Sequence, residues 1–234
     1  MQIMHFLTRE ELQSIPLFQS LSDQEADCLT TRVYRSDHDK DQLLAMEQDW
    51  GDCIYLIFSG FAKVRSYSEQ GDERVFCLLG AGDIFGEMSF LDGHARSADV
   101  VALTGISLIK FPGQMLMNMM HSNPNLALEI AKLEAGRLRD LNRRFSLRTE
   151  DALTRILDAI AYIANKSGDQ VEGECTSLPD IAQQEIGLLA GVSPETTSRV
   201  FKKLRERGVI GKYQGNLSIL NSELLTKRGL LIHC

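Results

Sequence analysis

Two short clusters in the first half of the chain combine residue types that bind phosphate. The first is Gly82–Phe90, with Gly86 and Glu87 at its centre, and the second is Arg96-Ser97-Ala98. A brief helix from Glu87 onwards would direct free backbone N–H groups at an anion, while the Arg96 guanidinium and the Ser97 hydroxyl approach from the next strand. This spacing predicts a cradle for one phosphate, with Glu87 accepting hydrogen bonds from a ribose hydroxyl. The plainer alternative is a turn with a surface arginine.

A second pattern, in the C-terminal third, is typical of a helix, a tight turn and another helix. Gly191 permits the turn, Ser193 is a helix N-cap, and Pro194 takes the first helical position, where its missing N–H is harmless. Arginine on the outer face of the second helix can contact guanine, and a carboxylate can accept from cytosine. We therefore predict a DNA-reading face made of Ser193, Glu195, Thr196, Ser198, Arg199 and Lys202. The alternative is an ordinary helical hairpin with a solvated polar face.

Further elements must position these clusters. From Arg32 to Phe111, short apolar runs separated by glycine-containing turns indicate a β-barrel or sandwich. A short helix is expected at Leu7–Ile15, because Thr8 and Glu11 have capping-box spacing. After the second helix of the DNA-reading pattern, Val209–Tyr213 and Leu217–Ile219 predict two strands, which makes the C-terminal region a winged helix.

A long helix is expected between these two regions, from about Leu126 to Leu147, followed by a second helix at Asp151–Asn165 and a polar loop at Asn165–Ser177. One stripe of the long helix is apolar, and its residues are Leu126, Ile130, Leu133, Leu138, Leu141 and Phe145. The stripe either covers the barrel or pairs with its copy in a dimer. The length of the helix and its charged opposite face favour the dimer.

Composition narrows the function classes. The 234 residues carry a net charge of -7 and are 44% hydrophobic, which is ordinary for a globular protein and excludes disorder. No apolar run is long enough to span a membrane, and the N-terminus does not have the pattern of a secretory signal, so we expect a cytoplasmic location. The five cysteines fit no disulfide or metal motif, and we expect reduced, mostly buried thiols. The five histidines show no metal spacing and no nucleophile with a base is visible, so neither a metal, a cofactor nor enzymatic activity is expected.

Charge is unevenly distributed along the chain. Acidic residues dominate the first half, whereas Arg137, Arg139, Arg143 and Arg144 form the core of an arginine cluster that extends to Arg148. The cluster either binds an anionic ligand or DNA, or it is a solvated helix face that pairs with acidic residues.

These motifs together resemble the cyclic-AMP receptor protein and FNR family of bacterial transcription regulators, over nearly the whole chain. Gly86-Glu87 followed by Arg96-Ser97-Ala98 is similar to the family's phosphate-binding cassette. The resemblance implies that Gly86, Glu87, Met88, Arg96 and Ser97 surround a cyclic phosphate and ribose. It also implies that the long helix is a dimer helix. Pro194–Arg199 is closer to the FNR-type recognition helix, which implies a TTGA-like half-site in a palindrome.

The sequence also departs from the family pattern. Cyclic-AMP-responsive members contact adenine with a hydroxyl pair on the dimer helix, where this chain has Leu141 and Asn142. Asn142 can serve, but Leu141 has no hydroxyl. The arginine cluster beside them is compatible with a more anionic messenger such as a cyclic dinucleotide. An iron–sulfur branch is not expected, because Cys28 is the only cysteine before Cys53. A haem branch would use His94 or Cys77, each of which is more often a plain loop or core residue.

We therefore expect an α+β chain with a cyclic-nucleotide-binding β-roll resembling a jelly roll at residues 1–121, a dimerisation helix at 122–147 and a winged helix-turn-helix at 148–234. The expected function is that of a ligand-responsive, homodimeric transcription regulator that binds palindromic DNA and contacts RNA polymerase, with cyclic AMP as its allosteric ligand. Two alternatives stay open: a different effector such as cyclic di-GMP, and a cyclic-nucleotide module that does not bind DNA.

Overall fold

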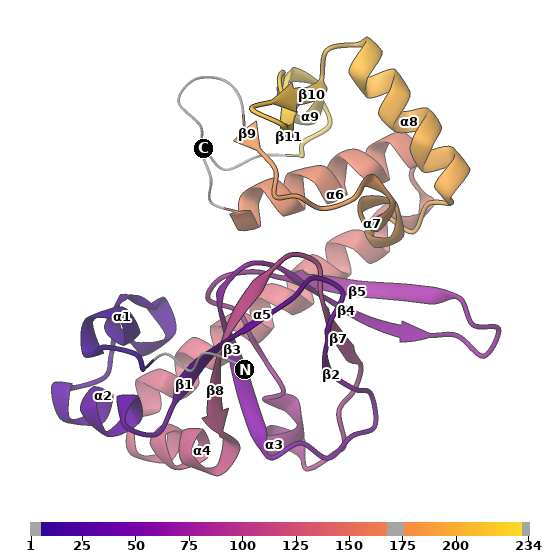
Figure 1. Ribbon diagram of the computed structural model, residues 1–234. Coiled ribbons are helices and arrows are strands. Elements are labelled where there is room, and N and C mark those ends of the chain that lie inside the picture. The colour runs from indigo at the N-terminus through magenta and orange to yellow at the C-terminus, as the bar shows by residue number, and fades with distance from the viewer. Residues whose placement is uncertain (1–5, 168–175, 231–234) are drawn as a thin grey trace. The chain divides into compact units, whose positions relative to one another are not determined.

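The computed structural model describes residues 6–167 and 176–230 (Figure 1). The chain divides into two compact units, residues 1–66 with 79–139, and residues 67–78 with 140–234. A run of antiparallel strands is flanked by helices along the chain, which confirms the expected α+β class. No helix within the described residues is long and apolar enough to cross a membrane.

Two four-stranded antiparallel sheets form the β-rich part. The first has the order β1-β8-β3-β6 and the second β2-β7-β4-β5. Their bounds are β1 Tyr34–His38, β2 Leu43–Ala45, β3 Cys53–Ser59, β4 Ala62–Tyr67, β5 Glu73–Leu79, β6 Ile84–Phe85, β7 Asp99–Ala102 and β8 Ile106–Pro112. Two antiparallel four-stranded sheets are the jelly-roll-like arrangement that the short, regularly spaced apolar runs predicted.

Helices cover one side of these strands (Figure 1). They are α1 Arg9–Ser14, the short 3₁₀ helix η1 Pro16–Phe18, α2 Asp23–Thr30, α4 Gly113–Ser122 and the first half of α5 Pro124–Ser146, while the short α3 Met88–Asp92 follows β6. The expected capping box of α1 is present, with Thr8 and Glu11 bonded to each other's backbone N–H. The shared core includes Phe18 and Phe111, whose ring centroids are 5.3 Å apart.

The apolar stripe of α5 has two different environments. Leu126 and Ile130 are buried in the core of the first unit, and Leu133 packs partly against it. In contrast, Leu138 and Phe145 are 59% and 69% exposed in the single chain. The first part of the stripe therefore covers the sheet, and the second part has no such role within the described chain.

In the second unit, several helices pack together beside a small sheet. A 3₁₀ turn η2 Leu147–Thr149 leads to α6 Ala152–Ser167, which is followed by β9 Thr176–Ser177, α7 Gln183–Leu189, α8 Pro194–Glu206, β10 Ile210–Tyr213, β11 Asn216–Ile219 and α9 Glu223–Lys227. The sheet order is β10-β11-β9. The expectation of an irregular loop at 165–177 was wrong at both ends, because α6 extends to Ser167 and β9 pairs with β11.

The cysteine expectation was also wrong in part. Cys53 is buried and Cys77 is intermediate, but Cys28 lies on the outer side of α2 and is exposed. Cys175 and Cys234 lie outside the described residues.

Candidate functional site

Gly86 and Arg96 form one packed unit after β6. Gly86 has a φ of +88°, and a Cβ atom at this position would lie 2.1 Å from Nη1 of Arg96. The Arg96 side chain is buried and donates hydrogen bonds to the carbonyl oxygens of Gly86 and Cys53. Only glycine accommodates both the left-handed backbone and the close guanidinium. The structure thus brings together two residues that the sequence analysis placed at one site.

The backbone of Arg96 is held by the loop after β2. Gln48 N donates to Arg96 O at 2.8 Å, and Arg96 N donates to Asp49 O at 2.9 Å. Next to it, Ser97 is exposed and its hydroxyl lies 3.7 Å from the sulfur of Met88. A guanidinium has five N–H donors in a fixed plane, and together with the nearby hydroxyl it is suited to a phosphate.

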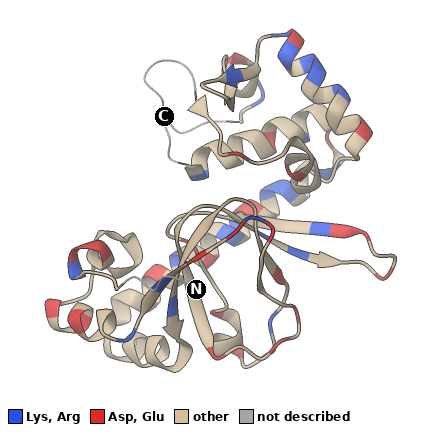
Figure 2. Ribbon diagram, viewed as in Figure 1, with Lys and Arg blue, Asp and Glu red and all other residues tan. Residues whose placement is uncertain are grey.

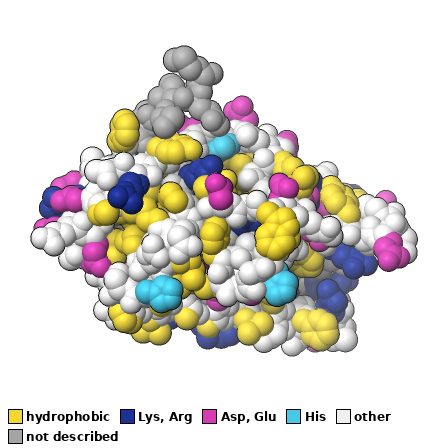
Figure 3. Space-filling view, turned by 90° about the horizontal axis from the view of Figure 1, so that it is seen from below, with side chains coloured by type: hydrophobic (Ala, Val, Ile, Leu, Met, Phe, Trp, Pro, Cys, Tyr) yellow, Lys and Arg dark blue, Asp and Glu magenta, His cyan; other side chains and the backbone are white. Residues whose placement is uncertain are grey.

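Met88 itself has no distinguishing environment. It is 46% exposed, and other apolar side chains of the first unit, such as Trp50, are exposed as well. Figure 3 shows apolar side chains mixed with polar and charged ones across one face of the molecule. Exposed apolar residues are common on proteins, so the place of Met88 in the site rests on its contact with Ser97.

Glu87 is the most buried acid of this cluster, at 3% exposure. Its Oε1 accepts a hydrogen bond of 3.0 Å from Nη1 of Arg137, while its Oε2 is buried and has no hydrogen-bond partner among the described residues. Burial raises the pKa of Glu87 to about 7; the charge of Arg137 lowers it and the neighbouring Glu134 raises it. Burying a hydrogen-bond acceptor costs free energy unless a donor reaches it. This oxygen is placed to accept a hydrogen bond from a ligand hydroxyl.

Arg137 is a member of this site that sequence reasoning did not assign to it. It extends from α5, contacts Glu87 and Glu134, and donates to the carbonyl oxygen of Ile84. Its guanidinium also lies 3.9 Å from Asp83. In the sequence, Arg137 belongs to the arginine cluster, which was expected either to bind an anionic ligand or DNA, or to be a solvated helix face that pairs with acidic residues. The only local signal was the Glu134–Arg137 spacing of one helical turn.

Arg143, Arg144 and Arg148 of the arginine cluster lie in the second unit, whereas Arg139 ends the first unit. Arg143 forms an ion pair with Asp158, which is 1% exposed. Arg148 lies over the ring of Phe145, 5.3 Å from its centroid. These contacts agree with the expectation of a helix face paired within the protein. Arg144 differs, because its Nη2 is buried without a hydrogen-bond partner in the part of the chain that is described.

Leu141 and Asn142, which we expected in the ligand site, also belong to the second unit and are exposed. There they border a cavity of about 650 Å³ together with residues of β5, α6 and α7. Leu141 supplies an apolar wall and Asn142 an amide that can donate and accept hydrogen bonds.

The DNA-reading helix α8 begins as the sequence predicted. The Ser193 hydroxyl accepts from Thr196 N at 3.4 Å, and Pro194 is the first helical residue. Val200, Phe201 and Leu204 are buried. Gly187 in α7 is required for close packing, because a Cβ there would lie 2.3 Å from the Thr197 hydroxyl. The pattern of burial therefore fixes which side of α8 faces outward.

On that outer side, Lys and Arg gather along α8, as Figure 2 shows. Exposed residues include Ser193, Glu195, Ser198, Arg199 and Lys202, and Thr196 is half-buried. Nη2 of Arg199 donates to the Thr196 hydroxyl at 3.2 Å. The structure thus presents all six predicted DNA-reading residues on one helix and its cap. A cationic, polar helix face of this kind can contact both phosphates and base edges.

Other sites considered from the sequence find little support. The His94 side chain is 81% exposed and lies 3.5 Å from Asp92. Within residues 6–167 and 176–230, no group of three His, Cys, Asp or Glu side chains is arranged to hold a metal ion.

Comparisons with known proteins match two parts of the chain to two known domain families. Residues 36–123 match the family described as "Cyclic nucleotide-binding domain", and residues 153–228 match "Crp-like helix-turn-helix domain". The chain is 30% identical to the "Cyclic AMP receptor protein" of Thermus thermophilus, over 92% of this chain and 96% of that protein. It is 26% identical to a "CRP-like cAMP-activated global transcriptional regulator" of Mycobacterium tuberculosis, over 94% of this chain and 98% of that protein.

Solved structures share the fold. FixK2 from Bradyrhizobium japonicum superimposes with a TM-score of 0.72 at 20% identity, covering 83% of this chain and 96% of FixK2. The regulator CLP of Xanthomonas campestris gives a TM-score of 0.69 at 20% identity, covering 86% of this chain and all of CLP. A cyclic-nucleotide-binding domain followed by a helix-turn-helix domain is the domain content of a transcription regulator. The chain belongs to the cyclic AMP receptor protein/FNR family of transcription regulators, a family of regulators and not of enzymes.

Proposed function

We propose that this protein is a homodimeric regulator that binds palindromic DNA when a cyclic nucleotide, cyclic AMP in the first place, occupies the site at Gly86–Ser97. The observation that carries the proposal is the unpartnered, buried Oε2 of Glu87 beside the Arg96–Ser97 pair. A cyclic nucleotide offers both partners at once, because its phosphate and its ribose hydroxyl lie on the same sugar. Arg96 and Ser97 would hold the phosphate, Glu87 the hydroxyl, and Met88 would border the sugar.

Charge around the site favours a mononucleotide over a cyclic dinucleotide. Asp83, Glu87 and Glu134 lie 3.9, 3.0 and 2.7 Å from the Arg137 guanidinium, so three carboxylates already share this one cation. A second phosphate would add a further negative charge to this set. The names of the relatives in Thermus thermophilus and Mycobacterium tuberculosis also point to cyclic AMP. Cyclic di-GMP remains the alternative effector, since CLP is described as responsive to it.

The remaining parts of the chain support a dimer on DNA. We assign 1–121 to nucleotide sensing, 122–147 to dimerisation and 148–234 to DNA binding. Leu141 and Asn142 would contribute to the nucleotide site from the dimer helix. Two copies of α8 would present Ser193, Glu195, Thr196, Ser198, Arg199 and Lys202 to TTGA-like half-sites about 34 Å apart. We expect RNA polymerase to be a protein partner. We also expect the protein to act in the cytoplasm.

The test is fluorescence anisotropy with a labelled palindromic duplex, with and without cyclic AMP, at fixed salt. We expect cyclic AMP to tighten binding of the native protein at least tenfold. Ser97→Ala removes an exposed hydroxyl that contributes little to packing, so it should weaken the nucleotide response and leave basal DNA binding unchanged. Arg199→Ala should lower the binding free energy for the palindromic duplex by ~1–3 kcal/mol through one base pair of each half-site. It should change the affinity for random DNA little.

Three outcomes would each contradict one part of the proposal: the effector, the binding to DNA, or the role of Arg199. Equal affinity with and without cyclic AMP, combined with a response to cyclic di-GMP, would replace the effector. Nucleotide binding by calorimetry without any salt-dependent binding to DNA would leave a nucleotide module that does not act on DNA. If Arg199→Ala lowered the affinity for random and for palindromic DNA equally, Arg199 would contact a phosphate and not a base.

A further inference from the structure

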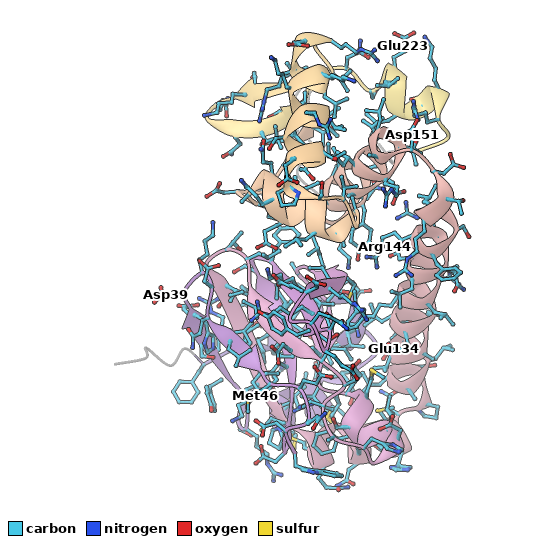
Figure 4. All side chains as sticks on the ribbon, turned by 90° about the vertical axis from the view of Figure 1, so that its right-hand side faces the viewer. Asp39, Met46, Glu134, Arg144, Asp151 and Glu223 are labelled. Carbon is cyan, nitrogen blue, oxygen red and sulfur yellow. The ribbon has the colours of Figure 1, made fainter. Side chains whose placement is uncertain are left out.

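Glu134 shares a hydrogen-bond donor with Glu87, although no motif marks it. Helix α5 carries Glu134 one turn before Arg137, on the side that faces the strands (Figure 4). Nη1 of Arg137 lies 2.7 Å from Oε1 of Glu134 and 3.0 Å from Oε1 of Glu87. One guanidinium nitrogen therefore bridges two carboxyl groups that come from separate elements.

Two further charged groups, Asp83 and Arg96, lie near this pair. Asp83 precedes β6 and lies 3.9 Å from the Arg137 guanidinium, and Arg96 reaches the carbonyl of Gly86, next to Glu87. With all three acids ionised, two guanidinium groups face three carboxylates, so the cluster is negative by one charge. A bound cyclic phosphate adds another negative charge in a buried setting, where like charges repel strongly.

We propose that Glu134 is a positioning residue which shares one proton with Glu87 across Arg137, so that binding of a cyclic nucleotide takes up this proton. The inference rests on the proposed function. Oε1 of Glu87 and Oε1 of Glu134 both lie within hydrogen-bond distance of the same nitrogen, Nη1 of Arg137, so two carboxyl groups depend on one donor. A proton on one of the two groups relieves the repulsion between them. Oε2 of Glu87 has no partner among the described residues and can accept a hydrogen bond from a ribose hydroxyl.

The direction of the pH dependence follows from this arrangement. Burial raises the pKa of Glu87 to about 7 in the protein described here. The phosphate charge raises the pKa of the pair further, so the complex keeps its proton at a pH where the free protein has lost it. Affinity is therefore constant below pH 7 and falls as the pH rises above it, by up to about tenfold per pH unit.

The experiment is calorimetric titration with cyclic AMP from pH 6 to 8.5, in buffers that differ in ionisation enthalpy, which counts the protons taken up. For the native protein we expect uptake of close to one proton per site at pH 8 and the loss of affinity stated above. Glu134→Gln keeps the shape and a donor but cannot share the proton. Because burial still acts on Glu87, this variant should show the fall in affinity starting at least one pH unit lower than the native protein does.

Glu129→Gln is the matched control. Glu129 lies on the same helix and its contact is Lys132, at 2.6 Å, away from the Arg137 cluster. This variant should keep the native pH profile. Native affinity that does not change with pH would overturn the proposal, and so would a Glu134→Gln variant that keeps the native profile.

A ligand-free measurement separates this proposal from the proposed function. In protein labelled with ¹³C at the glutamate carboxyl carbons, one resonance should titrate near pH 7, and in Glu134→Gln its midpoint should fall by at least one pH unit. If cyclic AMP does not bind at any pH, the proposed function fails while the resonance still reports on the pair. A midpoint that does not move in Glu134→Gln would overturn the role of Glu134.

Discussion

At the scale of single residues, the proposed phosphate cradle depends on a glycine without a side chain and on the arginine that packs against it. Arg96 fills the space beside Gly86, and its buried guanidinium is held by carbonyl oxygens from two segments. The same guanidinium is the group proposed to receive the phosphate. Its position is fixed before a ligand arrives, so little conformational entropy needs to be lost on binding.

We expect Gly86→Ala to destabilise the protein by more than the cost of a left-handed alanine, because the new methyl group meets Arg96 at 2.1 Å. Gly82→Ala is the control, since Gly82 has a φ of +85° and nothing within 4 Å of its added Cβ. Gly82→Ala should lose about 1–2 kcal/mol in urea unfolding, and Gly86→Ala about 2 kcal/mol more, as expected for overpacking. Equal losses would show that the Arg96 contact is unimportant for folding.

At the scale of elements, α8 depends on a cap at its start and on a buried stripe along its length. The cap contact runs from Thr196 N to the Ser193 hydroxyl, and Val200, Phe201 and Leu204 form the buried stripe. The cap orients the first turn, which carries Glu195, Thr196 and Ser198. Loss of the cap would therefore affect stability and the geometry of the DNA-reading face together.

Ser193→Ala should lower the free energy of unfolding by about 1 kcal/mol, the usual effect of removing a serine N-cap. Ser198→Ala is the matched change on the same helix, because Ser198 is exposed and its contact is the Gln183 side chain at 3.5 Å. Ser198→Ala should leave the free energy of unfolding within about 0.5 kcal/mol of the native value. Urea titrations followed by circular dichroism compare the two variants. A larger loss of unfolding free energy in Ser198→Ala than in Ser193→Ala would refute the role of the cap.

At the scale of the whole molecule, the second half of the α5 stripe is the strongest indication of a second copy. The exposed residues Leu138, Leu141 and Phe145 continue the pattern that buries Leu126 and Ile130 in the first unit. Exposed apolar residues at coiled-coil spacing are typical of helix pairs. We expect this part of α5 to pack against its copy in a dimer.

Leu138→Asp should weaken that dimer about thirtyfold or more, corresponding to ~2 kcal/mol, because it buries a carboxylate in the interface. Leu128→Asp is the control, since Leu128 is also exposed, at 54%, on the same helix but off the stripe. Sedimentation over a concentration series measures both. A Leu138→Asp variant that stays dimeric at native concentrations would place the interface elsewhere.

Features that depend on neighbouring residues were predictable from the sequence. The capping box of α1, the Ser193 cap and Pro194 of α8, and the β4–β5 hairpin all follow from contacts or turns within a few residues. The two-sheet fold followed from regular apolar runs. In contrast, β9 was missed, because two residues that pair with a strand some forty positions later show no periodicity of their own.

The amino-acid sequence by itself determined the β-rich region, the long helix after it and the outward face of α8, because these depend on local geometry and on apolar periodicity. Only the tertiary structure decided that Arg137 meets Glu87, fifty residues earlier, and that Glu134 joins them. It also decided that Cys28 is exposed. Which distant side chains meet, and how far water is excluded from them, depends on how separate elements pack, and burial in turn sets the pKa of Glu87.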